Sequence, residues 1–202
     1  MTDQVTVTTY PYRSDAVIAA ARLAADGIAS SVEADDEGGL NPGFYRDYGV
    51  RLVVAAGDAD DAFVSLGIER MPVPRLVARA MTAHAAFTYP EEACGLVLFA
   101  NGLPVFLCCV DNVDRSEQRF TIAPADHHGV ITFAERNGWE VGGIFHSHPR
   151  SPARPSGADI AGGGDPAWVH FIAGPVAGRA GELRAYRIVD GSVDEVSLVV
   201  EA

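Results

Sequence analysis

The chain of 202 residues contains no lysine, so all 15 of its basic residues are arginine. Against 27 acidic residues, these arginines leave a formal net charge of −12. Nucleic-acid binding depends on clustered Lys and Arg side chains that neutralise phosphates and release counterions. Because the charge balance is so strongly acidic, we do not expect nucleic acid to be a partner.

Cysteine is scarce too, and the three residues are Cys94, Cys108 and Cys109. Their number is odd, and two adjacent cysteines point to opposite faces if they lie on a strand, which argues against a disulfide framework. No apolar run reaches the roughly 18 residues of a membrane-spanning helix, and no leader pattern is present. Apolar residues still make up 48% of the chain, enough for a packed core. We therefore expect a soluble, cytoplasmic protein.

Residues 1–70 are predicted to form a small domain of mixed strands and helices. Runs of β-branched residues and helical spacing place strands at 4–10, 28–33 and 49–55, and helices at 14–25 and 58–66. The acidic, glycine-rich residues 35–43 predict a turn. This β-α-β-β-α order suggests a small α+β sandwich. Pro72 and Pro74 are expected to interrupt regular structure, so we place a domain boundary at 71–74.

Part of this first domain is similar to a known family. Residues 48–54 (Tyr-Gly-Val-Arg-Leu-Val-Val) and the acidic segment 58–62 resemble a small domain of prokaryotic signal-transducing proteins. The resemblance implies a regulatory or sensing role for residues 1–70.

Residues 72–202 are predicted to form a second domain that is rich in strands. Asn101-Gly102 between two apolar runs is a strong hairpin signal. The patterns predict helices at 76–86, 124–137 and 156–161, and strands at 94–100, 105–110, 140–148, 168–173, 182–189 and 193–200.

A pair of histidines at the end of one predicted strand suggests a metal site. Residues two apart on a strand point to the same face, so His146 and His148 present two imidazoles side by side. Pro149 ends the strand, and Asp159 can return on the next helix as a third ligand. Two nitrogens, one carboxylate and one open position are typical of a catalytic zinc rather than a structural one.

Each part of this pattern also has a simpler explanation. A lone His-x-His is often a polar strand face, and Ser156-Gly157-Ala158-Asp159 fits a helix capping box. Taken together, however, His-Ser-His-Pro at 146–149 followed by Ser-x-x-Asp at 156–159 resembles the motif of the JAMM (MPN-plus, JAB1/MPN/Mov34) metallopeptidase family, in its compact bacterial form. The family also needs an upstream glutamate, and Pro-Glu-Glu-Ala-Cys-Gly-Leu at 90–96 looks like that element.

The resemblance covers roughly residues 72–200 and implies both a fold and a set of roles. The fold is of the α/β (α+β) class: a cytidine-deaminase-like sandwich with a curved mixed sheet flanked by helices. His146, His148 and Asp159 would bind one zinc ion per chain. Glu92 would act as the general base, and Ser156 would donate a hydrogen bond to the oxyanion. Glu91 is adjacent to Glu92 and equally acidic; the spacing Glu-x-Cys-Gly selects Glu92.

The resemblance to bacterial members of this family implies that the chain is a peptidase or isopeptidase. It would act at the C-terminal Gly-Gly tail of a ubiquitin-like or sulfur-carrier protein. Such an enzyme either cuts a conjugate, such as an isopeptide or a cysteine adduct, or trims an extended tail. An alternative is a non-catalytic sensing or binding protein that uses residues 1–70, with the second domain as a scaffold. A Cys–His nucleophile at Cys94 is less favoured than a small buried cysteine. The sequence leaves open the oligomeric state, a homodimer included.

Overall fold

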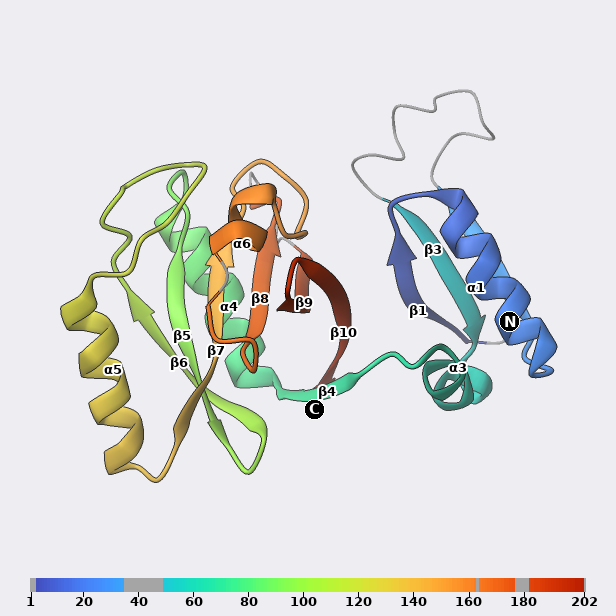
Figure 1. Ribbon diagram of the computed structural model, residues 1–202, viewed down its shortest axis with the longest axis horizontal. Helices are drawn as coiled ribbons and strands as arrows, with labels where there is room; N and C mark the ends of the chain where they lie inside the picture. Colours follow the sequence, from blue (N-terminus) through green and yellow to red (C-terminus); the bar gives the residue numbers. More distant parts are fainter. Residues whose placement is uncertain (1–2, 35–48, 163, 177–181, 202) are drawn as a thin grey trace. The chain divides into compact units, whose positions relative to one another are not determined.

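The computed structural model describes residues 3–34, 49–162, 164–176 and 182–201 (Figure 1). The chain divides into two compact units, Met1–Arg70 and Met71–Ala202. The turn predicted at 35–43 lies outside the described residues. No helix in the described part of the chain has the length and apolar character needed to cross a membrane.

In the first unit, the residues that the structure describes form a three-stranded antiparallel sheet with two helices. The central strand β3 (Val50–Ala55) pairs with β1 (Gln4–Tyr10) on one side and β2 (Ser30–Ala34) on the other. The helices α1 (Arg13–Ala25) and α3 (Ala59–Leu66) contact each other and the sheet, with a short 3-10 turn, η1 (Ala56–Asp58), before α3. Leu23, Leu52 and Phe63 lie in their shared core. The predicted β-α-β-β-α order is confirmed here; the resemblance to signal-transducing domains stays a prediction.

The described residues of the second unit form three helices and seven strands. The helices are α4 (Arg75–Thr88), α5 (Pro124–Arg136) and α6 (Gly157–Gly162). The strands are β4 (Arg70–Pro74), β5 (Cys94–Ala100), β6 (Leu103–Val110), β7 (Glu140–Ser147), β8 (Val169–Gly174), β9 (Glu182–Val189) and β10 (Ser192–Glu201).

These strands form one mixed sheet in the order β4-β10-β9-β8-β7-β5-β6. The pair β7–β8 is parallel, whereas β5–β6, β5–β7, β8–β9 and β9–β10 are antiparallel. The sheet curls, so that β9 and β10 bend away from the plane of β5 and β7 (Figure 1). The predicted fold class, a curved mixed sheet flanked by helices, is confirmed.

Alternate residues of the central strands face two different cores. Val97 of β5 and Phe145 of β7 pack with Met81 of α4 in the larger core. Leu96 of β5 and Ile144 of β7 belong instead to the core that α5 completes. Because successive strand residues point to opposite faces, α4 and α5 cover opposite faces of the sheet.

The structure divides the chain between Arg70 and Met71, but the expectation that Pro72 and Pro74 interrupt regular structure is wrong. Residues Arg70–Pro74 form β4, which lies at the edge of the seven-stranded sheet next to β10. Proline is tolerated at a sheet edge, where its missing N–H can face away from the neighbouring strand. Pro72 and Pro74 therefore do not interrupt regular structure at this point. The Asn101-Gly102 hairpin is confirmed, with both residues at positive φ (52° and 77°) between β5 and β6.

Candidate metal and catalytic site

The two motif histidines lie at the carboxyl end of β7, in the middle of the curled sheet. His146 is opposite Cys94 of β5 in the antiparallel register, and His148 follows the last residue of the strand. Both imidazoles are buried, and their Nε2 atoms are 3.1 Å apart. Placing two imidazole nitrogens this close follows from the two-residue spacing on an extended backbone.

Asp159 of α6 completes the cluster. Its Oδ1 is 3.2 Å from Nε2 of His146, and its Oδ2 is 3.5 Å from Nε2 of His148. The capping box also forms: Ser156 N donates to Asp159 Oδ2 (2.6 Å), and Asp159 N donates to Ser156 Oγ (3.2 Å). Asp159 therefore both caps the helix and faces the histidines, because one carboxylate offers several lone pairs.

The spacing of these three side chains fits a tetrahedral metal ion. Zinc bonds to nitrogen and oxygen of about 2.0–2.2 Å place tetrahedral ligand atoms roughly 3.3–3.6 Å apart. The ligand atoms of His146, His148 and Asp159 lie within 4.8 Å of one another, and the three closest approaches are 3.1, 3.2 and 3.5 Å. The donor set of two imidazoles and one carboxylate is also one that zinc accepts.

The orientation of each imidazole is fixed by what its ring contacts. His148 Nδ1 is 2.8 Å from the backbone oxygen of Pro152, so a proton on Nδ1 leaves the Nε2 lone pair directed at the cluster. The ring of Phe120 stacks on His146 at 4.8 Å between centroids and 22° between planes. Sequence reasoning did not identify Phe120 or the Pro152 carbonyl, since neither belongs to the motif.

The charges of the cluster depend on one another. Burial acts to raise the pKa of the Asp159 carboxyl, but hydrogen bonds with His146 and His148 outweigh it and hold that pKa below its usual range. Burial lowers the pKa of His146. Burial also acts to lower the pKa of His148, but its hydrogen bond with Asp159 raises this pKa above the ordinary value. The carboxylate thus stays ionised, as a metal ligand must.

Glu92 is buried beside this cluster, whereas Glu91 is half-exposed. The side chain of Glu92 is 5% exposed, and the antiparallel pairing of Cys94 with His146 carries it toward His148. Burial raises the pKa of Glu92 to about 7, nearby His148 lowers it, and Asp159 raises it. A carboxyl group with a pKa near 7 can both accept and release a proton at neutral pH.

Backbone hydrogen bonds hold Glu92 in place from two sides. Ser116 O accepts a hydrogen bond from Glu92 N (2.8 Å), and the side-chain amide of Asn112 donates to Glu92 O (3.1 Å). The oxygen of that amide accepts from the backbone of Asp114 and Thr121. Asn112 is itself buried, and sequence reasoning missed it, since an isolated Asn in a loop carries no motif.

Cys94 behaves as a structural residue. It is fully buried, its Sγ is 3.7 Å from the carbonyl of Val110, and burial raises the pKa of its thiol to about 12. A nucleophilic cysteine needs a lowered pKa. The interpretation of Cys94 as a small buried residue is therefore supported.

Comparison with known proteins identifies the family of the second unit. The family described as prokaryotic homologs of the JAB domain matches residues 74–189. The chain belongs to this JAB family. The CysO-cysteine peptidases of Mycobacterium tuberculosis and Mycobacterium bovis are 31% identical to it over 121 residues, which is 59% of this chain and 83% of those proteins.

Two solved structures are similar to this chain over most of their own length. The solution structure of a protein from Desulfitobacterium hafniense is 27% identical, with a TM-score of 0.59, over 65% of this chain and 92% of that one. A protein from Salinibacter ruber is 29% identical, with a TM-score of 0.51, over 65% of this chain and 91% of the other. The family match over residues 74–189 confirms the JAMM resemblance inferred for residues 72–200 at the level of the family.

A cavity of about 260 Å³ opens beside the ligand cluster of this JAB domain. Its walls include His146 and Asp159 of the cluster and extend along β7, α6 and β8. The other lining residues are Gln118, Arg119, Phe120, Ile144, Ala158, Gly162, Gly164, Trp168 and His170. Phe120 and Trp168 give the cavity aromatic walls. Beyond the cluster, it is also lined by one arginine, Arg119, and one histidine, His170.

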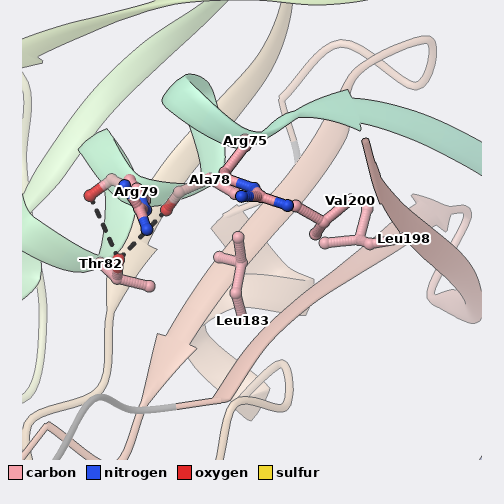
Figure 2. A pocket seen from close by; sticks show the side chains of 7 residues that line it. All are labelled: Arg75, Ala78, Arg79, Thr82, Leu183, Leu198 and Val200. Carbon is pink, nitrogen blue, oxygen red and sulfur yellow. Dashed lines mark hydrogen bonds between the residues drawn. The ribbon is translucent and has the colours of Figure 1, made fainter. Parts of the chain in front are cut away.

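A second hollow, of about 450 Å³, lies between α4 and the strands β9 and β10 of the JAB domain (Figure 2). Its apolar wall is formed by Leu183, Leu198 and Val200, and Arg75 and Arg79 lie along its helical side. It is lined by none of the three cluster residues. The two hollows share no lining residue.

Proposed function

We propose that this chain is a zinc-dependent peptidase that hydrolyses the amide bond after the C-terminal Gly-Gly of a sulfur-carrier or other ubiquitin-like protein. The observation that carries the proposal is the tetrahedral spacing of His146, His148 and Asp159 beside the buried carboxyl of Glu92. The name of the mycobacterial relatives, CysO-cysteine peptidase, favours a bond to cysteine as the bond that is cleaved. The Gly-Gly tail comes from the JAMM resemblance.

The cluster is suited to hold zinc at Nε2 of His146, Nε2 of His148 and the carboxylate of Asp159. Zinc in such a site supplies a Lewis acid that polarises a carbonyl and lowers the pKa of water to about 7. The hydrogen bond from His148 to Pro152 O keeps that ring aligned during the reaction.

Glu92 carries the proton in this proposal. Its carboxylate accepts a proton from the attacking water, whose oxygen forms the new bond to the acyl carbon. The same carboxyl then gives the proton to the leaving nitrogen as the C–N bond breaks. A pKa of about 7 suits both steps, because the group is neither too weak a base nor too weak an acid.

Ser156 is proposed to donate its hydroxyl proton to the oxyanion of the tetrahedral intermediate. Its side chain is exposed, and its Oγ is 3.2 Å from Asp159 N, from which it accepts a hydrogen bond. An oxygen that accepts from the backbone N–H still has its own O–H to donate. The helix cap and the oxyanion role are therefore compatible for the hydroxyl of Ser156.

The test is incubation of the purified chain with carrier proteins from the same organism that end in Gly-Gly-Cys, followed by intact-mass measurement. Loss of one cysteine residue from the carrier supports the proposal, and the Glu92→Gln variant is the matched control because it keeps the metal ligands. A zinc-loaded, folded chain that leaves every Gly-Gly-extended carrier intact would overturn it.

A further inference from the structure

The cavity beside the cluster is lined by a buried histidine with one unpaired ring nitrogen. His170 of β8 is 4% exposed, lines the cavity wall, and its Nε2 has no hydrogen-bond partner among the described residues. Leaving such a buried polar atom unpaired costs free energy, so each case calls for an explanation. A ligand that accepts a hydrogen bond from this imidazole is one.

Arg119 brings a positive charge to the same cavity. Its side chain is 72% exposed, and its Nε lies 3.6 Å from Oδ2 of Asp114, a long ion pair. The guanidinium has five N–H donors, so its Nη atoms keep donor capacity beyond that contact. Asp114 Oδ2 is also the acceptor for Thr121 Oγ1 at 2.7 Å, and this shares the carboxylate between two donors.

We propose that this cavity is a subsite for the carboxylate of a leaving amino acid, with Arg119 and His170 as specificity-determining residues. The inference rests on the proposed function and deepens it: the substrate is a carrier protein with one free amino acid linked through its α-nitrogen. Planar guanidinium and imidazole donors suit a carboxylate, since charge-assisted hydrogen bonds are stronger than neutral ones.

The cavity borders the ligand cluster, so a carboxylate close to the reacting bond can reach it. In an α-linked amino acid the carboxylate carbon is separated from the scissile nitrogen by one carbon atom, so it stays close to the reacting bond. In an isopeptide the nitrogen belongs to a lysine side chain, whose α-carbon is far away and part of another protein. A cavity of about 260 Å³ with walls formed by Phe120 and Trp168 has room for a single small amino acid and not for a protein chain.

Arg119 is the charged donor in this wall, and its guanidinium can pair with the carboxylate of the leaving amino acid. The reaction is then hydrolysis: water adds to the glycyl carbonyl, the C–N bond breaks, and the products are a carrier ending in a Gly-Gly carboxylate and a free amino acid.

The first experiment compares two synthetic substrates, a carrier ending in Gly-Gly-Cys as the free acid and the same carrier as the C-terminal amide. We expect kcat/KM to be roughly 10- to 100-fold higher for the acid, the range of one charge-assisted hydrogen bond. Arg119→Ala should lower the acid rate by that factor and leave the amide rate nearly unchanged. Arg79→Ala, which removes an arginine at the second hollow, is the control and should alter neither.

The second experiment tests His170 separately. His170→Leu removes the imidazole hydrogen bond and should lower the rate for the acid more than for the amide, whereas His170→Gln should restore part of the preference. Zinc content and thermal unfolding verify that each variant is folded. If both variants lower acid and amide rates equally, His170 is a packing residue and its part of the proposal is wrong.

Binding separates failure of the subsite from failure of the proposed function. In the Glu92→Gln variant, Trp168 fluorescence reports occupancy of the cavity once the other tryptophan is replaced by Trp139→Phe. Tighter binding of the acid than of the amide supports the subsite even where no substrate is hydrolysed. Equal binding of the two, or cleavage of a lysine-linked isopeptide as fast as of the acid, would overturn it.

Discussion

Ser147 and Ala93 are joined by two hydrogen bonds: Ala93 N donates to Ser147 Oγ (2.9 Å), and Ser147 N donates to Ala93 O (3.0 Å). Ser147 lies between the two motif histidines, and Ala93 follows Glu92. The pair therefore fixes the segment that carries the candidate base to the strand that carries the candidate ligands. Ser147 of the His-Ser-His motif therefore has a structural role, in addition to the metal-binding role proposed for the histidines on either side of it.

Replacing Ser147 by alanine should destabilise the protein and lower its activity. The variant leaves the buried Ala93 N–H without its acceptor, which costs about 1–3 kcal/mol. Urea denaturation measures this loss. Ser192→Ala, at an exposed position, is the control and should stay within about 0.5 kcal/mol of the parent protein. Equal stabilities for the two variants would contradict the role of Ser147.

Glu92→Gln should keep zinc and lose hydrolysis by roughly 10²- to 10⁴-fold, the range of general acid–base catalysis. Glu91→Gln should have little effect, because that side chain is half-exposed and Glu92 is the buried one. Zinc content by elemental analysis and initial rates on one substrate distinguish the two. If Glu92→Gln cleaves normally and Glu91→Gln does not, Glu91 is the base and the assignment of that role to Glu92 is wrong.

Removal of metal should abolish activity and lower the unfolding temperature. The purified protein is expected to contain close to one zinc per chain, and His146→Ala should lose both metal and hydrolysis. A ligand that binds the folded state at 100 times its Kd adds about 2.7 kcal/mol of stability, so re-addition of zinc to the chelated protein should raise the unfolding temperature. Metal-free protein with full activity would exclude the zinc mechanism.

Glu92 should also make the metal-free protein less stable as the pH rises from about 4.5 to about 7. Its pKa is raised by burial from 4.5 to about 7, so the folded state holds a proton that the unfolded state has already lost. Stability from this group is full below pH 4.5 and is lost as the pH passes through 7. The contribution of Glu92 is measured as the difference in unfolding free energy between the parent protein and Glu92→Gln at each pH. A difference that does not change with pH would contradict the raised pKa of Glu92.

The two units can be tested by truncation at two positions. A chain that starts at Ile68 keeps β4, and we expect it to fold and to retain peptidase chemistry with altered substrate choice or regulation. A chain that starts at Arg75 loses β4 and exposes the edge of β10, so it should aggregate or unfold at lower temperature. Light scattering and thermal unfolding compare them. Failure of both chains to fold would mean that the two units form one cooperative domain.

Local pattern was enough for the elements whose signals are local. The Asn101-Gly102 turn follows from the positive φ that a tight hairpin demands, and the capping box at Ser156 and Asp159 from their three-residue spacing. The strand at Arg70–Pro74 was missed for the opposite reason. Its prolines argue against a strand in general, and only its place at the edge of the sheet makes them acceptable.

The sequence by itself determined that His146 and His148 share a face and that Asp159 can reach them from the next helix, because these relations depend on short-range geometry. Tertiary structure alone decided that Glu92 is buried and Glu91 is not, and that Phe120, Asn112 and His170 belong to the site. Those residues come from separate loops and strands, and burial and charge at each depend on contacts that no local spacing encodes.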